Sequence, residues 1–469
     1  MRSLRLAVVR FPRQLGLSGL ALLPLALSAS LPPVWGQNQG RTEGAVAAIP
    51  ALPPLPPALA QPVLQSQVSC STLQQRLQAT VGAEAPVWSV TVADGSGHLL
   101  ADVNGLQPRV PASNQKLIST AFALDRLGPD FRLNTQLWRL PDGRLRLTGQ
   151  GDPDLDLPQL QRLARISLGS GGGDNPTPAP VTLELAEENP AGWWPRGWHP
   201  ADRTAAYGAP ITRLAVTSNA LTDAVANPNA RLNQLLRRAL AQNGGANRVQ
   251  LQWVPASAPL PQEAVLLHVE PSTSMEGLLS LANTHSHNFT AEVLLRSAAG
   301  SWNLDQATRL ARQWLEQQGL PLQGVSVADG SGLDRSNRLT SRLLAALLLR
   351  MDQHPYGRYY VASLAVAGQR GTLRRLYKGS SLEGQLHGKT GTLTGVRAIS
   401  GVLQTPEGVR YVSAISNGAA EPNATIGRLF RQVQSPGLCP ELTAATSVGS
   451  GPLQRTTPAG GLGVSALGL

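Results

Sequence analysis

The chain has 469 residues, 42% of them hydrophobic and 15% charged, and a formal net charge of +11. This composition is ample for a sizeable core and favours two or three domains. No run of five like charges occurs and lysine is scarce, which argues against a nucleic-acid-binding arm. A mildly basic charge is compatible with an anionic polymer such as a cell wall, but it does not identify one.

The first 36 residues have the pattern of a secretory signal peptide. Arginines between residues 2 and 13 precede an apolar run over residues 15–31 that is broken by one proline. This run is short for a membrane span and small residues follow it, so we expect export to the periplasm or cell wall. Cleavage near Ala29 or Gly36 is expected, and retention as an uncleaved anchor is the alternative.

Two stretches lie outside the apparent globular part. Residues 37–66 are rich in proline and predict an extended, mobile linker. Residues 441–469 are rich in Gly, Ser and Thr and predict a disordered tail. Cys70 and Cys439 stand at the two ends of the part between them, and in an exported protein they favour one disulfide. Two independent buried thiols are the alternative.

The predicted elements begin with a helix over residues 70–82. Two strands follow over residues 87–105, around an Asp-Gly turn, and then a helix over residues 111–128. Pro111 suits the first turn of this helix, and Gly128 can end it. Apolar residues at spacings of four, three and three form one stripe along it, namely Leu117, Ala121, Leu124 and Leu127.

The predicted secondary structure changes between residues 130 and 264, where short strands alternate with turns and a Gly-rich loop. Helices return from residue 275, and a pair of strands closes the globular part. This order predicts an α+β domain made of residues 67–129 and 265–440, split by a β-rich insertion over residues 130–264.

A serine and a lysine lie three residues apart at the start of the helix over residues 111–128. Residues at this spacing share a helix face, so Ser113 and Lys116 project into one space. If that space is a cleft, burial lowers the lysine pKa and lets its neutral amine take the serine proton. The alternative is a solvent-facing pair on an ordinary helix, because S-x-x-K occurs often by chance.

Two further motifs favour the catalytic interpretation of Ser113 and Lys116. They are Ser286-His287-Asn288 in a loop between helices, and Lys389-Thr390-Gly391 in a late strand. S-x-x-K, S-x-N and K-T-G in this order suit acyl transfer through a serine. Ser113 would form the acyl-enzyme with Lys116 as base, and the backbone N–H groups of Ser113 and Thr392 would bind the oxyanion. Ser286 would relay protons between Lys116, Lys389 and the leaving group, and Asn288 would hold the substrate amide or orient Lys116. Lys389 and Thr390 would bind a substrate carboxylate, while Gly391 admits the substrate backbone.

The three motifs resemble those of the penicillin-recognising serine enzymes. The long interval between the first two motifs is similar to that of the D-Ala-D-Ala carboxypeptidases and endopeptidases, the low-molecular-mass class C penicillin-binding proteins. Over residues 70–420 this resemblance implies a penicillin-binding-protein/β-lactamase-like transpeptidase domain. It implies peptidoglycan peptides as substrates and β-lactam antibiotics as covalent inhibitors.

The same resemblance implies a pocket for the side chain of the stem peptide. Asp202 and Tyr207 in the insertion would face its diamino acid, and Arg335 would bind a remote carboxylate. This sequence departs from the family pattern at His287, where Asp is usual, at Asp334, where Ser is usual, and at Thr394, where Gln can occur. The first departure should affect the chemistry little, because its side chain should point away from the serine, whereas the other two bear on side-chain specificity.

The residues therefore predict a serine-type D-Ala-D-Ala carboxypeptidase or endopeptidase that needs no cofactor. A β-lactamase or esterase of the same fold, and a non-catalytic cell-wall-binding protein, are the alternatives. His285 and His287 could suggest a metal site, but residues two apart do not share a helix face, and no carboxylate or third histidine lies nearby in the sequence. No metal and no nucleic-acid partner is expected.

Overall fold

The computed structural model describes residues 63–169 and 180–439, all of which belong to the structural unit formed by residues 44–469. The predicted signal peptide, nearly all of the proline-rich linker and the predicted tail lie outside the described residues. Within the described ranges, no helix is both long and apolar enough to cross a membrane.

The first of two sheets has six antiparallel strands in the order β2-β1-β11-β10-β9-β8. They are β1 (Trp88–Asp94), β2 (Leu99–Val103), β8 (Ala365–Val366), β9 (Leu386–Leu393), β10 (Val396–Thr405) and β11 (Gly408–Asn417). In β1, Trp88, Val90 and Val92 alternate with Ser89 and Thr91, as expected where opposite sides of a strand meet different layers. The sheet combines the predicted N-terminal strand pair with the predicted C-terminal pair, from the two ends of the globular part.

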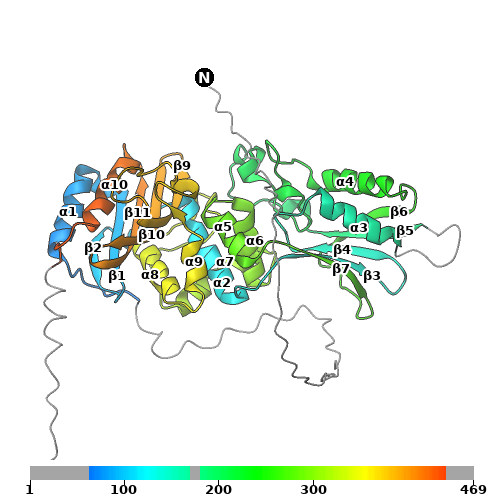
Figure 1. Cartoon of the computed structure of the whole chain (residues 1–469), viewed down its shortest axis with the longest axis horizontal. Coiled ribbons are helices and arrows are strands. Elements are labelled where there is room, and N and C mark those ends of the chain that lie inside the picture. Colours follow the sequence, from blue (N-terminus) through cyan, green and yellow to red (C-terminus); the bar gives the residue numbers. More distant parts are fainter. Residues whose placement is uncertain (1–62, 170–179, 440–469) are drawn as a thin grey trace, which may run out of the picture. The chain divides into compact units, whose positions relative to one another are not determined.

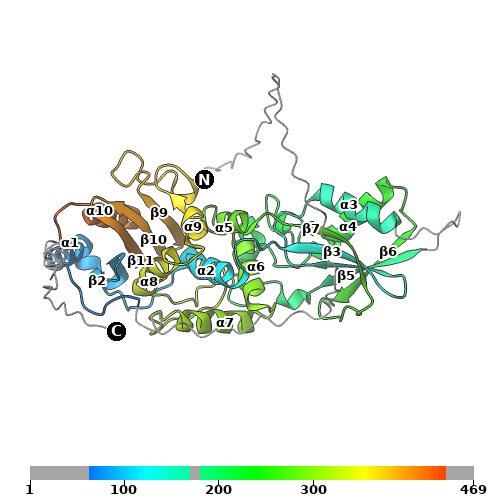
Figure 2. The same cartoon turned by 60° about the horizontal axis from the view of Figure 1, so that its bottom comes forward.

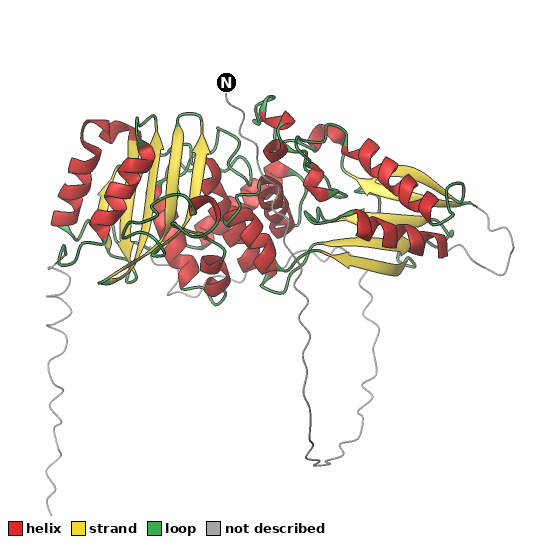
Figure 3. Cartoon of the chain, turned by 45° about the horizontal axis from the view of Figure 1, so that its top comes forward, coloured by secondary structure: helices red, strands yellow, loops and turns green. Residues whose placement is uncertain are grey.

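Two helices cover one face of this sheet (Figures 1 and 3). They are α1 (Ser71–Val81) and α10 (Pro422–Val433), which pack on each other and on the strands. Cys70, just before α1, forms a disulfide with Cys439, just after α10, with a Cα–Cα distance of 5.2 Å. The two ends of this domain are therefore tied together on one face.

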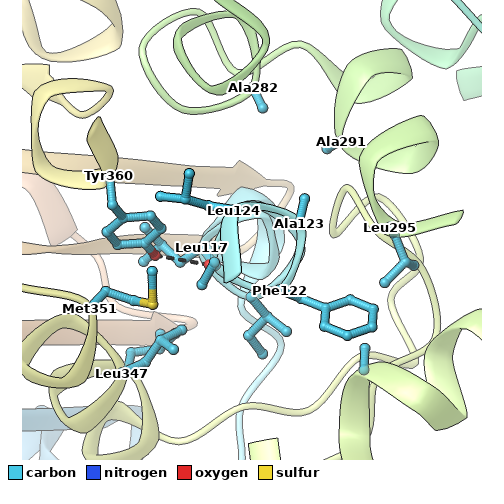
Figure 4. Packing of buried hydrophobic residues seen from close by; sticks show 14 of the residues in the cluster. Leu117, Phe122, Ala123, Leu124, Ala282, Ala291, Leu295, Leu347, Met351 and Tyr360 are labelled. Carbon is cyan, nitrogen blue, oxygen red and sulfur yellow. Dashed lines mark hydrogen bonds between the residues drawn. The ribbon is translucent and has the colours of Figure 1, made fainter. Parts of the chain in front are cut away.

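The opposite face packs against α8 (Ser341–Asp352), which leads into a helical layer around α2 (Gln115–Leu127). Around α2 lie α5 (Met275–Asn283), α6 (Asn288–Ala299), α7 (Leu304–Gln317) and α9 (Gly357–Ala362) (Figure 2). The predicted apolar stripe of α2 is buried among them except at Leu127, which is partly buried. The Tyr360 hydroxyl donates to the Leu117 carbonyl over 2.8 Å (Figure 4). This packing fixes the helix that carries Lys116.

The second sheet has five strands in the order β6-β5-β4-β3-β7. They are β3 (Asn134–Arg139), β4 (Leu145–Gly149), β5 (Val181–Glu187), β6 (Val249–Pro255) and β7 (Val265–Pro271). The pairs β4–β5 and β5–β6 are parallel, and α3 (Leu157–Gly169) and α4 (Pro228–Gln242) pack on each other beside this sheet (Figure 1).

The predicted β-rich insertion contains this five-stranded sheet and, in addition, the helices α3 and α4, which the sequence analysis did not predict. One predicted boundary of the insertion needs correction. The predicted boundary after residue 264 falls before β7, which pairs with β3 and so completes the insertion sheet. The segment between β5 and α4 contains three short 3₁₀ turns, at residues 190–192, 202–204 and 206–208, and a left-handed turn at residues 217–219.

Candidate active site

Ser113 and Lys116 meet at the entry to α2. Ser113 lies in a 3₁₀ turn (Ala112–Asn114) that precedes the helix, so the α-helix itself begins two residues after the serine. Lys116 Nζ lies 2.9 Å from Ser113 Oγ, with the serine partly exposed and the lysine fully buried. The three-residue spacing thus brings the amine to the hydroxyl, as the sequence predicted.

The backbone just before Ser113 is constrained from a second segment. Ala112 has φ of 47°, a left-handed conformation that side chains other than glycine rarely adopt. A Cβ on Gly332 would lie 1.9 Å from the Ala112 carbonyl oxygen, so only glycine allows this approach. The loop over residues 329–334 therefore lies in close backbone contact with the turn that contains Ser113.

Lys116 has two further partners. Its Nζ donates to Asn288 Oδ1 over 2.6 Å and to the Ser331 carbonyl over 2.6 Å. Burial lowers the pKa of Lys116 to about 7, against the opposing attraction of Asp329 and Glu292. A sizeable fraction of the amines is therefore neutral near pH 7 and can accept the serine proton.

Two buried carboxylates shape the loop that contacts Lys116, and sequence reasoning missed both. Glu292 Oε1 accepts from the backbone N–H groups of Gly330 and Ser331, each over 2.9 Å. Asp329 accepts from the backbone N–H groups of Gly332 and Asp334, over 2.7 and 2.8 Å. These bonds hold the Ser331 carbonyl against Lys116. The only sequence signal was the stretch DGSGLDRSNRLT over residues 329–340, which resembles the same family.

The second and third motifs also meet. Lys389 Nζ, fully buried in β9, lies 2.8 Å from Ser286 Oγ and 2.9 Å from the Thr390 carbonyl oxygen. Ser286 has φ of 61°, in the left-handed region, which marks the turn just before α6. Burial holds the pKa of Lys389 well below its ordinary value, and repulsion from Lys116 acts in the same direction.

Asn288 connects the site to the insertion. While its Oδ1 accepts from Lys116, its Nδ2 donates to the Tyr207 carbonyl over 2.8 Å. His287 turns to its own helix, where Nδ1 lies 2.7 Å from Thr290 Oγ1. Burial, then repulsion from Lys116, lowers the pKa of His287 to about 4, so the ring is neutral at pH 7.

The free edge of β9 passes beside the serine turn. Strand β8 pairs only with His387 and Gly388, so in the described ranges no strand covers the outer edge beyond them. A Cβ on Gly391 would lie 2.5 Å from the Pro111 carbonyl oxygen, and Asn114 Nδ2 donates to the Lys389 carbonyl over 3.2 Å. Thr392, one residue further along β9, is exposed.

The other predicted binding residues lie in two places. The Tyr207 hydroxyl donates to Asp202 Oδ1 over 2.7 Å, and Tyr207 is 53% exposed. Arg335 is exposed and donates to the Thr394 carbonyl over 3.1 Å, just beyond the K-T-G motif. Asp334 is buried, and its Oδ1 accepts from the Ser336 hydroxyl over 2.6 Å. Among the described residues, no hydrogen bond or ion pair joins Asp202 to Arg335.

The described residues contain no cluster of three or more His, Cys, Asp or Glu side chains placed to hold a metal ion. The arrangement instead combines an accessible serine, two buried lysines and a second serine, with a strand edge open beside them. These groups suit nucleophilic attack on a carbonyl followed by proton transfer to a leaving group.

Comparison with known proteins identifies the family. Residues 70–225 and 216–429 match the D-Ala-D-Ala carboxypeptidase 3 (S13) family. The chain belongs to this family. The resemblance inferred from the three motifs is thereby confirmed, and the protein is a peptidase of the S13 family.

Relatives and solved structures agree with this assignment. The chain is 28% identical over 432 residues to the D-alanyl-D-alanine carboxypeptidase of Actinomadura sp. (strain R39), covering 72% of this chain and 79% of the relative. It is 27% identical over 433 residues to the carboxypeptidase DacB of Mycolicibacterium smegmatis, covering 82% and 89%. Penicillin binding protein 4 (dacB) from Haemophilus influenzae has a similar structure, with a TM-score of 0.63 at 20% identity, covering 77% of this chain and 98% of that one. The predicted fold class is confirmed.

Proposed function

We propose that this S13 peptidase cleaves the D-Ala-D-Ala bond, or a D-amino-acid cross-link, of peptidoglycan stem peptides through an acyl-enzyme on Ser113. The observation that carries the proposal is the fully buried Lys116, whose amine lies 2.9 Å from Ser113 Oγ and whose pKa is lowered to about 7. A neutral amine at this distance is a competent general base for the serine.

In the acylation step, Ser113 Oγ attacks the carbonyl carbon and its proton passes to Lys116 Nζ. The backbone N–H groups of Ser113 and Thr392 stabilise the oxyanion. The amide C–N bond then breaks, and the proton from Lys116 reaches the departing amine through the Ser286 hydroxyl. Water attacks the ester in the second step, Lys116 accepts its proton, and Ser113 Oγ regains a hydrogen when the acid leaves.

Lys389 and Thr390 bind the terminal carboxylate of the substrate. The pKa of Lys389 is held low by burial and by Lys116 when the site is empty. An incoming carboxylate supplies the negative charge that favours the ammonium form, so substrate binding and charging of Lys389 reinforce each other. Gly391 leaves room for the substrate backbone to lie along β9.

The pocket for the stem-peptide side chain is formed by Asp202, Tyr207 and Arg335. Support comes from the link between Tyr207 and Asn288, which brings the insertion to the catalytic lysine, and from the position of Arg335 at the end of β9. The carboxylate of Asp202 would pair with an amino group, and Arg335 with a carboxylate.

β-Lactams acylate the same serine, and the enzyme works outside the cytoplasm. The first statement is supported by a structure of Haemophilus influenzae penicillin binding protein 4 complexed with a β-lactam, similar to this chain with a TM-score of 0.61. The second is supported by the N-terminal sequence pattern and by the nature of the proposed substrate.

The decisive experiment is intact-protein mass spectrometry of residues 37–469 after incubation with benzylpenicillin, with Ser113→Ala alongside. A penicilloyl adduct on Ser113 that is absent from the variant is expected. Rapid hydrolysis of the drug without an adduct would indicate a β-lactamase instead. Folded protein that gives neither result would exclude catalysis and leave a wall-binding protein.

A further inference from the structure

A groove of about 770 Å³ lies in the insertion, lined by residues that have no part in the proposed chemistry. One wall is a face of α4, another contains Trp193, and Trp253 of β6 contributes a third side. The lining combines two indole rings with amide side chains and a single charged group; the polar members are Asn227, Asn229, Asn233, Gln234 and Arg237.

The amide groups along α4 leave much of their hydrogen-bonding capacity unused. Asn229, Asn233 and Arg237 recur at intervals of four and so share one face of the helix. Asn233 Oδ1 accepts from Arg237 Nε over 2.7 Å, which leaves its two amide N–H donors for other partners. The side chains of Asn229 and Gln234 make no hydrogen bond within the described ranges, and each offers both a donor and an acceptor.

The two tryptophans supply the apolar part of the groove. Trp253 is partly exposed on the edge strand of the five-stranded sheet. Trp193 is 5% exposed, yet its indole Nε1 has no hydrogen-bond partner among the described residues. Buried indole N–H groups usually find a partner, but this nitrogen has almost no exposed surface, so Trp193 contributes its ring and not a donor to the groove.

We infer that this groove binds a saccharide, and specifically the polysaccharide chain of amino sugars to which the stem peptides are attached. Sugar rings present apolar C–H faces that suit an indole, and hydroxyl and acetamido groups that pair with amides. One cation among the lining residues is too little for a polyanion such as a nucleic acid. The choice of an amino-sugar polymer rests on the proposed function, whereas saccharide binding itself does not.

The groove is connected to the catalytic site through a short stretch of chain. The Trp193 carbonyl accepts from the Ile211 N–H over 2.8 Å, and Trp194 Nε1 donates to the Gly208 carbonyl over 2.9 Å. The neighbouring Tyr207 carbonyl accepts from Asn288. A polysaccharide chain bound in the groove would therefore raise the effective concentration of its attached peptides at Ser113.

The test is isothermal titration of the folded enzyme with chitotetraose, a tetramer of N-acetylglucosamine, and with cellotetraose, which lacks the acetamido groups. We expect chitotetraose to bind, with a Kd raised at least tenfold in Trp253→Ala and at least threefold in Gln234→Ala. Gln78→Ala, an exposed glutamine on α1, is the matched control and should bind as the wild type does.

Benzylpenicillin acylation of Ser113 is measured on every variant, because a variant that still forms the adduct is folded. If Trp253→Ala fails this check, Asn229→Ala and Gln234→Ala carry the test. The inference is overturned if chitotetraose does not bind, if it binds all variants equally, or if cellotetraose binds as tightly. Failure of acylation in the wild type would instead contradict the proposed function; the fold of each variant is then checked by thermal unfolding, and the titration still tests the groove.

Discussion

Asn288 donates to the Tyr207 carbonyl over 2.8 Å while its oxygen accepts from Lys116 over 2.6 Å. Replacing it by Asp keeps the acceptor for Lys116 but adds a negative charge and removes the donor to the insertion. We expect Asn288→Asp to raise the pKa of Lys116 by 1 unit or more, an effect on the order of that seen for close charge pairs. The rate of benzylpenicillin acylation at pH 7 should fall at least tenfold and recover in part at higher pH. Asn303→Asp, which adds the same charge at the exposed N-cap of α7, should leave the pH profile unchanged, and an unchanged profile in Asn288→Asp would contradict the role of Asn288.

The lowered pKa of Lys116, about 7, predicts the pH dependence of the enzyme. Only the neutral amine accepts the Ser113 proton, so the acylation rate should rise about tenfold per pH unit below 7 and level off above it. Lys116→Arg should lower the rate by about 10²–10⁴-fold, because a guanidinium stays charged at every accessible pH. Stopped-flow acylation between pH 5 and 9 measures both effects. A flat profile in the wild type would assign the base to another group.

Gly391→Ala tests the close approach of β9 to the serine turn. The new Cβ would lie 2.5 Å from the Pro111 carbonyl oxygen and 2.9 Å from Asn114 Nδ2, so one of the two segments must move. We expect the acylation rate to fall at least tenfold, since small displacements of a nucleophile are costly. Gly95→Ala, in the turn between β1 and β2 and with nothing within 4 Å of its Cβ, is the control for a glycine change away from the site. Equal rates in the two variants would show that β9 does not position Ser113.

Asp152 predicts a pH dependence of stability. It is 1% exposed, its Oδ2 has no partner in the described ranges, and burial is the main cause that raises its pKa to about 6. The unfolded chain ionises near pH 3.8, so stability falls as the pH rises from about 4 to 6, by up to about 3 kcal/mol.

Asp152→Asn removes this penalty. Its free energy of unfolding should exceed that of the wild type by about 2–3 kcal/mol at pH 8, with little difference at pH 3.5. Urea unfolding at both values of pH is the measurement, with the exposed Asp130→Asn as control. A gain of equal size at both values of pH would mean that the carboxyl is not the cause.

Some parts of this site could be predicted from the sequence, and others could not. The approach of Lys116 to Ser113 follows from the helical repeat, which is local. The contact between Lys389 and Ser286 joins residues 103 positions apart, and only the resemblance to a family indicated it. The Ser331 carbonyl was missed because a backbone oxygen leaves no mark on residue type. Glu292 was missed because a buried acid that binds backbone N–H groups resembles any helical glutamate.

In the insertion, helix α4 and the pairing of strand β7 were missed for different reasons. Helix α4 has Leu232, Leu236, Ala239 and Leu240 at helical spacing and Pro228 in its first turn, so its period was present in the sequence. It was missed because the sequence on either side of this helix has the pattern of short strands and turns. The membership of β7 could not be predicted in the same way, because its pairing with β3 closes a loop of more than a hundred residues and no local pattern encodes it.

The disulfide between Cys70 and Cys439 brings the beginning and the end of the catalytic fold within 5.2 Å of each other. The order in which the three motifs occur along the chain is therefore not demanded by the chemistry. A circular permutant that joins these two ends by a short peptide and opens at the exposed turn around Gly143 would begin inside the insertion. Its Ser-x-x-Lys pair would then follow Lys-Thr-Gly in the sequence, while Ser113, Lys116, Ser286 and Lys389 kept their places in space.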